Sequence, residues 1–280
     1  MSVITTAAEP TASRGERSPF GDVLRSEWTK LRTVRSTYWT LIAATVSSIA
    51  VGVLACAAYV HHFHQASPAA QRLTIAHGDF DSAGQSLIGL SLGQLAIGVL
   101  GVLVVSAEYR TGMMRTALTA VPRRMTVLLA KVACFGGVAL VTGQILSFGA
   151  YFLGQAVLSN ASLGSGIGDP GMARAVVGTG VFIALVGLCG LGLGAMIRHT
   201  AGAVSALVGF LLVLTPIVQA LPGSWGPAVG KFLPYEIGEQ AVSGQRLSEH
   251  LSPGVGLAVM AGYAVVFLAV GAALLVRRDA

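Results

Sequence analysis

Charged residues are scarce in this sequence. Only 11% of its 280 residues are Asp, Glu, Lys or Arg, against about 25% in soluble globular domains, whereas 54% are hydrophobic. The mean hydropathy is +0.73. These values exclude an ordinary soluble domain and indicate a membrane protein.

Six windows contain no Asp, Glu, Lys or Arg. Each window is close to the ~20 residues that a helix needs to cross ~30 Å of hydrocarbon. They are residues 38–60, 85–106, 132–158, 175–197, 200–221 and 255–276. Their apolar runs are continuous, which excludes the short alternating segments of a transmembrane β-barrel. The sequence therefore predicts an all-α integral membrane protein with six transmembrane helices.

Positive charge lies mostly on one side of these predicted spans. Fourteen of the 18 Lys and Arg fall in the N-terminal segment, around the loop between the second and third spans, at Arg198 and at the C-terminus. Cytoplasmic segments carry such an excess, so both termini are predicted to be cytoplasmic. The charge is spread over short segments rather than one basic face, which favours lipid head groups over nucleic acid as partners. Three Lys against fifteen Arg are typical of a GC-rich bacterial gene, and we expect a multi-pass protein of the bacterial cytoplasmic membrane.

Motifs for chemistry are missing as well. The three cysteines fall in different predicted spans, so no disulfide framework or metal spacing is readable. The nearest approach to an ATP-binding loop, at 226–232, is one residue short and lacks the hydroxyl. The six windows also hold no carboxylate, which excludes a proton relay and gives no catalytic residue for a membrane-embedded enzyme. We therefore expect no enzyme activity, and the free energy for any transport must come from elsewhere.

Two clusters of residues allow more than one interpretation. His61, His62 and His64 suggest either a metal site or an ordinary polar outer loop, and we predict no metal site. The glycine-rich stretch of the fourth span is not a dinucleotide loop, because no strand precedes it. Close helix packing is the better interpretation, since small residues let helix backbones approach in lipid. The glycines concerned are Gly187, Gly190, Gly192 and Gly194.

Three segments outside the spans have patterns of their own. Apolar residues recur at helical spacing from 107 to 121, which predicts a short cytoplasmic helix ended by Pro122. An ordinary positive loop would explain the arginines there, but not the apolar stripe or Glu108. Residues 20–37 predict an amphipathic elbow helix at the membrane surface, after a disordered tail at 1–19. Residues 222–254 form either short re-entrant helices that gate the outer face or a plain loop.

Two motifs resemble a known family. The segments SEWTKLRTVRSTYWTL (26–41) and EYRTGMMRTALTAVPRR (108–124) together resemble the permease subunits of bacterial ATP-binding-cassette exporters, of the type-2 export class common in actinobacteria. The resemblance extends more loosely through GLGLGAMIRHTAG (190–202) and FLPYEIGEQA (232–241). Tyr235, Glu236 and Glu239 depart from the family pattern.

The resemblance implies a permease domain over 38–280 that exports a hydrophobic or amphiphilic substrate. A separate ATPase subunit would bind ATP and magnesium, this chain would bind no cofactor, and two permeases would pair as a homodimer or heterodimer. The implied contacts with the ATPase are Glu108, Tyr109, Arg110, Thr111, Arg115, Pro122, Arg123 and Arg124 in the coupling helix, and Glu27, Trp28, Lys30, Leu31 and Arg32 in the elbow. The alternative is a non-transporting membrane scaffold or immunity-type subunit that binds a cytoplasmic partner.

Overall fold

The computed structural model describes residues 20–77, 80–111, 124–222, 225–245 and 250–278, and within these ranges the chain forms helices and loops without strands. Six helical segments are long and apolar enough to cross a membrane. They are Arg35–Gln65, Leu90–Tyr109, Met125–Ala161, Met172–Ile197, Thr200–Gln219 and Pro253–Arg277. The predicted all-α class and the six spans are confirmed, whereas the cytoplasmic orientation of the termini stays a prediction. The predicted tail at 1–19 lies outside the described residues.

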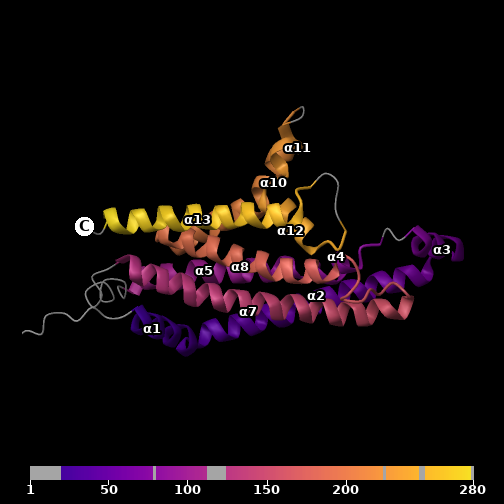
Figure 1. Cartoon of the computed structure of the whole chain (residues 1–280), viewed down its shortest axis with the longest axis horizontal. Helices are drawn as coiled ribbons and strands as arrows, with labels where there is room; N and C mark the ends of the chain where they lie inside the picture. The colour runs from indigo at the N-terminus through magenta and orange to yellow at the C-terminus, as the bar shows by residue number, and fades with distance from the viewer. Residues whose placement is uncertain (1–19, 78–79, 112–123, 223–224, 246–249, 279–280) are drawn as a thin grey trace, which may run out of the picture.

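The long helices run side by side as a bundle (Figure 1). They are α2 (Arg35–Gln65), α5 (Leu90–Thr111), α7 (Arg124–Leu158), α8 (Met172–Ile197) and α13 (Pro253–Arg278). The shorter elements are α1 (Phe20–Thr33), α3 (Pro68–His77), α4 (Ser82–Leu87), α9 (Thr200–Val208), α10 (Leu214–Gln219), α11 (Trp225–Gly230) and α12 (Pro234–Val242). A 3-10 turn over Ser159–Ala161 follows α7.

Helix α8 is the centre of the bundle. In its most apolar stretch 72% of the residues are buried, more than in any other span of the described chain, and it packs against α5, α7 and α13. Small residues make this packing close. A methyl group on Gly190 would lie 2.1 Å from the carbonyl oxygen of Gly98 in α5, and one on Gly192 would lie 2.7 Å from Cβ of Phe267 in α13. Gly187 and Gly194 likewise face α5. All four glycines singled out in the sequence therefore lie at helix–helix contacts.

The fifth span is bent. Between α9 and α10 the chain makes a π-helical turn over Gly209–Val213. Pro216 explains why a regular helix does not continue, because its ring lacks an N–H and would clash with the carbonyl of Leu212 in an unbroken α-helix. After the turn, α10 and α11 project away from the bundle (Figure 1). The chain then returns through α12, which packs on α4, α8 and α13.

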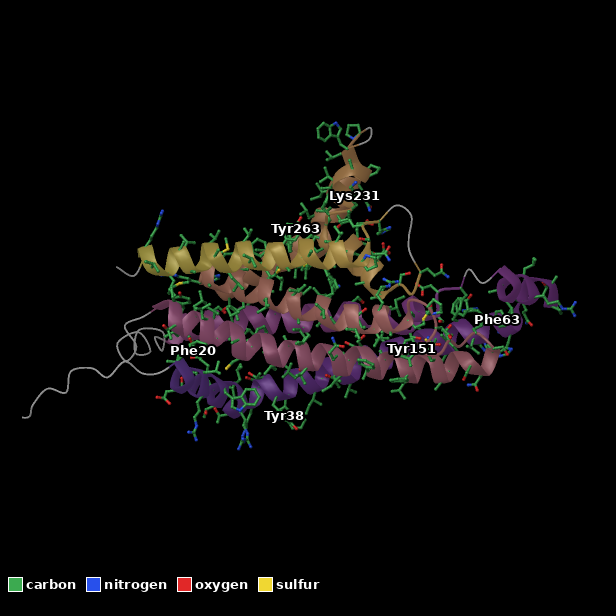
Figure 2. All side chains as sticks on the ribbon, viewed as in Figure 1. Phe20, Tyr38, Phe63, Tyr151, Lys231 and Tyr263 are labelled. Atoms are coloured by element: carbon green, nitrogen blue, oxygen red, sulfur yellow. The ribbon has the colours of Figure 1, made fainter. Side chains whose placement is uncertain are left out.

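The segment 222–254 thus contains two helices, α11 and α12, in its described part. Tyr263 of α13, labelled in Figure 2, holds the link between them by donating a hydrogen bond from its hydroxyl to the carbonyl of Phe232 at 3.1 Å. A gating role for these helices stays a prediction.

The N-terminal helix α1 covers most of the predicted elbow. It ends at Thr33, Val34 is extended, and the last residues of the predicted 20–37 segment already belong to α2. The side of α1 that packs on α7 buries Val23 and Glu27, whereas Phe20 and Trp28 remain about half exposed, at 48% and 50%. A glutamate therefore faces the bundle while aromatic residues of the same helix remain exposed.

Candidate functional site

A network of four charged side chains explains why Glu27 faces inward. Lys131 donates from Nζ to Oε2 of Glu27 at 2.6 Å and to Oε1 of Glu108 at 2.8 Å. Lys30 also reaches both carboxylates, at 2.5 Å from Oε1 of Glu27 and 3.2 Å from Oε1 of Glu108. The four residues, here called the charge network, join α1, the end of α5 and the start of α7. They lie at the end of the bundle where Phe20 is labelled in Figure 2.

Most of the charge network is enclosed by protein. The side chains of Lys131 and Glu27 are 3% and 4% exposed and that of Glu108 is 10% exposed, whereas that of Lys30 is 33% exposed. Buried charges are costly unless they are paired, and here two positive groups meet two negative ones. The network therefore holds three helices in one arrangement, since separating them would leave buried charges without partners.

The pairing also fixes the protonation of the two α1 residues. Burial alone would raise the pKa of Glu27, but the charges and hydrogen bonds of Lys131 and Lys30 outweigh it and hold the pKa below its ordinary value of 4.5. Burial would lower the pKa of Lys30, but Glu27 and Glu108 outweigh it and raise the pKa above 10.5. Both residues are therefore charged at neutral pH.

These directions predict how stability depends on pH. The contribution of Glu27 to stability is present above pH 4.5 and is lost as the pH falls through the lowered pKa of the folded state. The contribution of Lys30 is present below pH 10.5 and is lost as the pH rises through the raised pKa of the folded state. Thermal unfolding of the detergent-purified protein should therefore show a midpoint that falls on acidification below 4.5. In a Glu27→Gln variant the acid decline should be shallower, and an equally steep decline would contradict the assignment.

The charge network includes Glu108, which the resemblance assigned to the coupling helix and which lies in α5. Glu108 lies near the end of α5 and Lys131 near the start of α7, on either side of residues 112–123. Arg115, Pro122 and Arg123 lie outside the described residues. Arg110 and Thr111 continue α5 and Arg124 begins α7, but the structure does not describe their side chains.

Tyr109 makes a further link at this end of the bundle. Its ring packs against the core, and the guanidinium of Arg198, in the turn between α8 and α9, lies 4.7 Å from the ring centroid. This is the geometry of a cation–π contact. The end of α5 is therefore connected to α8 as well as to α1 and α7.

The structure divides the predicted elbow residues into two groups. Glu27 and Lys30 belong to the charge network and Leu31 packs partly against the core, whereas Trp28 and Arg32 are exposed. The exposed pair is available to lipid or to another protein.

Lys131 was not predicted from the sequence as a site residue, and the prediction that the spans contain no charged residues is wrong at their ends. The helices are longer than the charge-free windows, so Glu108, Lys131 and Arg174 fall inside the spanning segments. A signal was present in the sequence, since Glu108 is the only acidic residue between 106 and 124. A single glutamate in an arginine-rich segment is a candidate for an ion pair within the protein.

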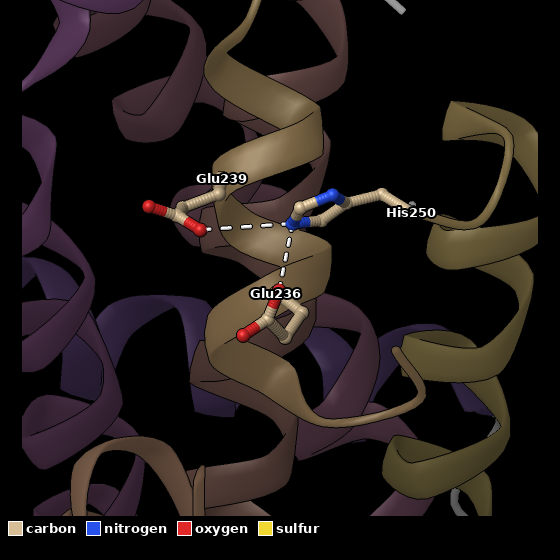
Figure 3. Close-up of side chains that lie close together, drawn as sticks. All are labelled: Glu236, Glu239 and His250. Carbon is tan, nitrogen blue, oxygen red and sulfur yellow. Dashed lines mark ion pairs between the residues drawn. The ribbon is translucent and has the colours of Figure 1, made fainter. Parts of the chain in front are cut away.

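A second cluster of titratable groups lies on α12. Glu236 and Glu239 are one turn apart on this helix, and His250 reaches them from the segment before α13 (Figure 3). Nε2 of His250 lies 2.7 Å from Oε2 of Glu236 and 3.6 Å from Oε2 of Glu239. One donor atom from each of the three lies within 4.8 Å of the others, so these residues have the spacing to hold a metal ion. They are distinct from His61, His62 and His64, which the sequence suggested as the alternative metal site.

A cavity of about 950 Å³ opens beside the second cluster. It lies between α2, α4, α5, α8 and α12, away from the charge network, and Glu239 is one of its lining residues. Aromatic rings also line it, from Tyr59, Phe80 and Phe182. Its volume lies in the range of about 300–1,000 Å³ that is usual for small-molecule sites.

The charge network and the cavity thus occupy different ends of one helix bundle, with α5 and α8 passing both. The charge network joins three helices through ion pairs, and the cavity has a volume usual for small-molecule sites. No family model matches the chain, and no curated protein matches it.

Proposed function

We propose that the chain is the permease subunit of an ATP-binding-cassette exporter, which moves a hydrophobic or amphiphilic molecule with energy from a separate ATPase. The observation that carries the proposal is the buried charge network, which ties α1 to the helices on both sides of residues 112–123. A partner that pushes on this segment or on α1 would move α1, α5 and α7 together. This supports the role that the sequence resemblance implies for both segments.

The distribution of charge within the spans supports an external source of energy. In the described spans the Asp, Glu, Lys and Arg residues lie toward the ends of the helices, and Lys131, which lies farthest from a helix end, is paired with Glu108. A proton-driven carrier needs groups at membrane depth that gain and lose charge. The most deeply placed charged group, Lys131, is instead held between the carboxylates of Glu27 and Glu108.

The cavity supports a hydrophobic or amphiphilic substrate. Its lining combines aromatic rings such as Phe80 and Phe182 with polar side chains such as Gln85 and Thr179. Because α5 and α8 pass both the cavity and the network end, a tilt of these helices would change access to the cavity. Two such chains, identical or different, would enclose the path that the substrate takes across the membrane.

The test uses the intact chain together with the ATP-binding-cassette ATPase that we expect the neighbouring reading frame to encode. Charge reversal Arg115→Glu should weaken ATPase co-purification by about tenfold or more, the equivalent of ~1.4 kcal/mol, because a contact between opposite charges becomes repulsive. ATP-dependent export from reconstituted vesicles should fall with it. The matched control is Arg72→Glu in α3, an exposed arginine that the predicted topology places on the other membrane face.

Equal assembly and export in both variants would contradict the coupling role. Assembly with the ATPase but no ATP-dependent flux for any substrate tested would favour the non-transporting scaffold or immunity-type subunit.

A further inference from the structure

We propose that Glu236, Glu239 and His250 form a binding site for a divalent transition-metal ion of the zinc type. The inference goes beyond the proposed transport function and does not depend on it. It follows from the second cluster, where side chains from two separate parts of the chain converge on one point (Figure 3).

The distances suit such an ion. Zinc binds histidine nitrogen and carboxylate oxygen at about 2.0–2.2 Å, so two ligands of one tetrahedral ion lie roughly 3.4 Å apart. Nε2 of His250 is 2.7 Å from Oε2 of Glu236 and 3.6 Å from Oε2 of Glu239. Changes of under about 1 Å in side-chain position would bring both pairs to the tetrahedral separation.

The enclosed position of the histidine ring supports a bound ion. The side chain of His250 is only 16% exposed, and both ring nitrogens are fully enclosed. Nδ1 makes no hydrogen bond within the described part of the chain, and Nε2 faces the carboxylate oxygens of Glu236 and Glu239. A metal ion bound between Nε2 and these oxygens would replace the direct contacts with coordination bonds.

The surroundings of Glu236 resemble those of a metal ligand. Gln219, at the end of α10, donates from Nε2 to Oε1 of Glu236 at 2.7 Å. This bond orients the carboxylate and leaves Oε2 directed at His250, as the outer hydrogen-bonding partners of metal ligands do. The glutamine also connects α10 to the cluster.

The donor set selects the class of ion. Imidazole nitrogen suits zinc, copper, nickel and iron, whereas magnesium and calcium prefer oxygen ligands alone. The two carboxylates bring a formal charge of −2, which a dication neutralises, and water would complete the coordination. A bound ion would fasten α12 to the start of α13 at the rim of the cavity, because Glu239 also lines that cavity.

The experiment is a Zn²⁺ titration of the full chain, purified in detergent without a polyhistidine tag and stripped of metal with a chelator. Isothermal titration should show one ion bound per chain, with no comparable binding of Mg²⁺. His250→Ala should abolish this binding, and Gln219→Ala should weaken it by about tenfold, the usual effect of losing an outer partner of a metal ligand. Circular dichroism would verify that each variant keeps its helical content.

The matched control is the triple variant His61→Ala, His62→Ala, His64→Ala, which removes the other group of histidines and should bind as tightly as the unmodified chain. Replacement of Zn²⁺ by Co²⁺ adds a direct readout, since the visible absorption of the bound ion should disappear with His250→Ala. Binding that survives His250→Ala, or that is lost only in the triple variant, would overturn the proposal. Absence of any stoichiometric binding would also overturn it and leave His250 as an ion-pair partner of Glu236.

Discussion

The substitution Lys131→Met is expected to destabilise the protein by about 3–5 kcal/mol, the usual result of leaving a buried charge without its partner. Lys131 bridges Glu27 and Glu108, whose side chains are only 4% and 10% exposed. Without the lysine, two carboxylates would remain close together with Lys30 as the single cation of the network. Methionine has a similar length and apolar character, so the effect would come from the lost charge rather than from a cavity.

The measurement is the midpoint of chemical unfolding in detergent micelles, compared with that of Lys30→Met. Lys30 contacts the same two glutamates, but its side chain is 33% exposed. Its loss should cost no more than about 1 kcal/mol, because water can replace part of the interaction and Lys131 still pairs both carboxylates. Equal effects of the two substitutions would contradict the view that burial makes Lys131 the centre of the network.

A second comparison separates charge from packing. Adding Glu27→Gln and Glu108→Gln to Lys131→Met removes the unpaired negative charges and should recover a large part of the lost stability, since neutral side chains can replace a buried ion pair at little net cost. If the triple variant is as unstable as the single one, packing rather than charge is responsible.

The sequence predicted the spans but not the charge network. The six spans were found correctly because hydropathy is a local property that adds along a helix; the fourth was predicted at 175–197 and occupies Met172–Ile197. Glycine packing was also readable, because small residues at helical spacing have few other uses within lipid.

Partners far apart in the chain could not be predicted from local patterns. Glu27 and Lys131 are separated by 104 positions, and a rule that counts positive charge treats Lys131 as one more cytoplasmic residue. The same limit applies to His250, whose contact with Glu236 depends on how α12 returns to the bundle. Glu236 and Glu239 depart from the pattern of the family that the sequence resembles, and this departure was the sequence signal for a distinct cluster here.

The substitution Gly190→Ala is expected to destabilise the protein, although alanine is the better helix former. In an unobstructed helix the change from glycine to alanine stabilises by about 0.5–1 kcal/mol. At Gly190 the new methyl group would lie 2.1 Å from the carbonyl oxygen of Gly98. Because that atom belongs to the backbone of α5, no side-chain rotation can relieve the clash, and α5 and α8 must move apart. Overpacking of this kind costs about 1–3 kcal/mol or more.

The matched control is Gly262→Ala in α13, where a methyl group meets no heavy atom of the described chain within 4 Å. This variant should unfold at the same denaturant concentration as the unmodified protein or at a higher one, so the two substitutions should act in opposite directions. Intrahelical propensity alone would make both stabilising. A Gly190→Ala protein as stable as the Gly262→Ala protein would therefore show that α5 and α8 are not in close contact at this point. The packing of α8 on α5, between the charge network and the cavity, would then differ from that described above.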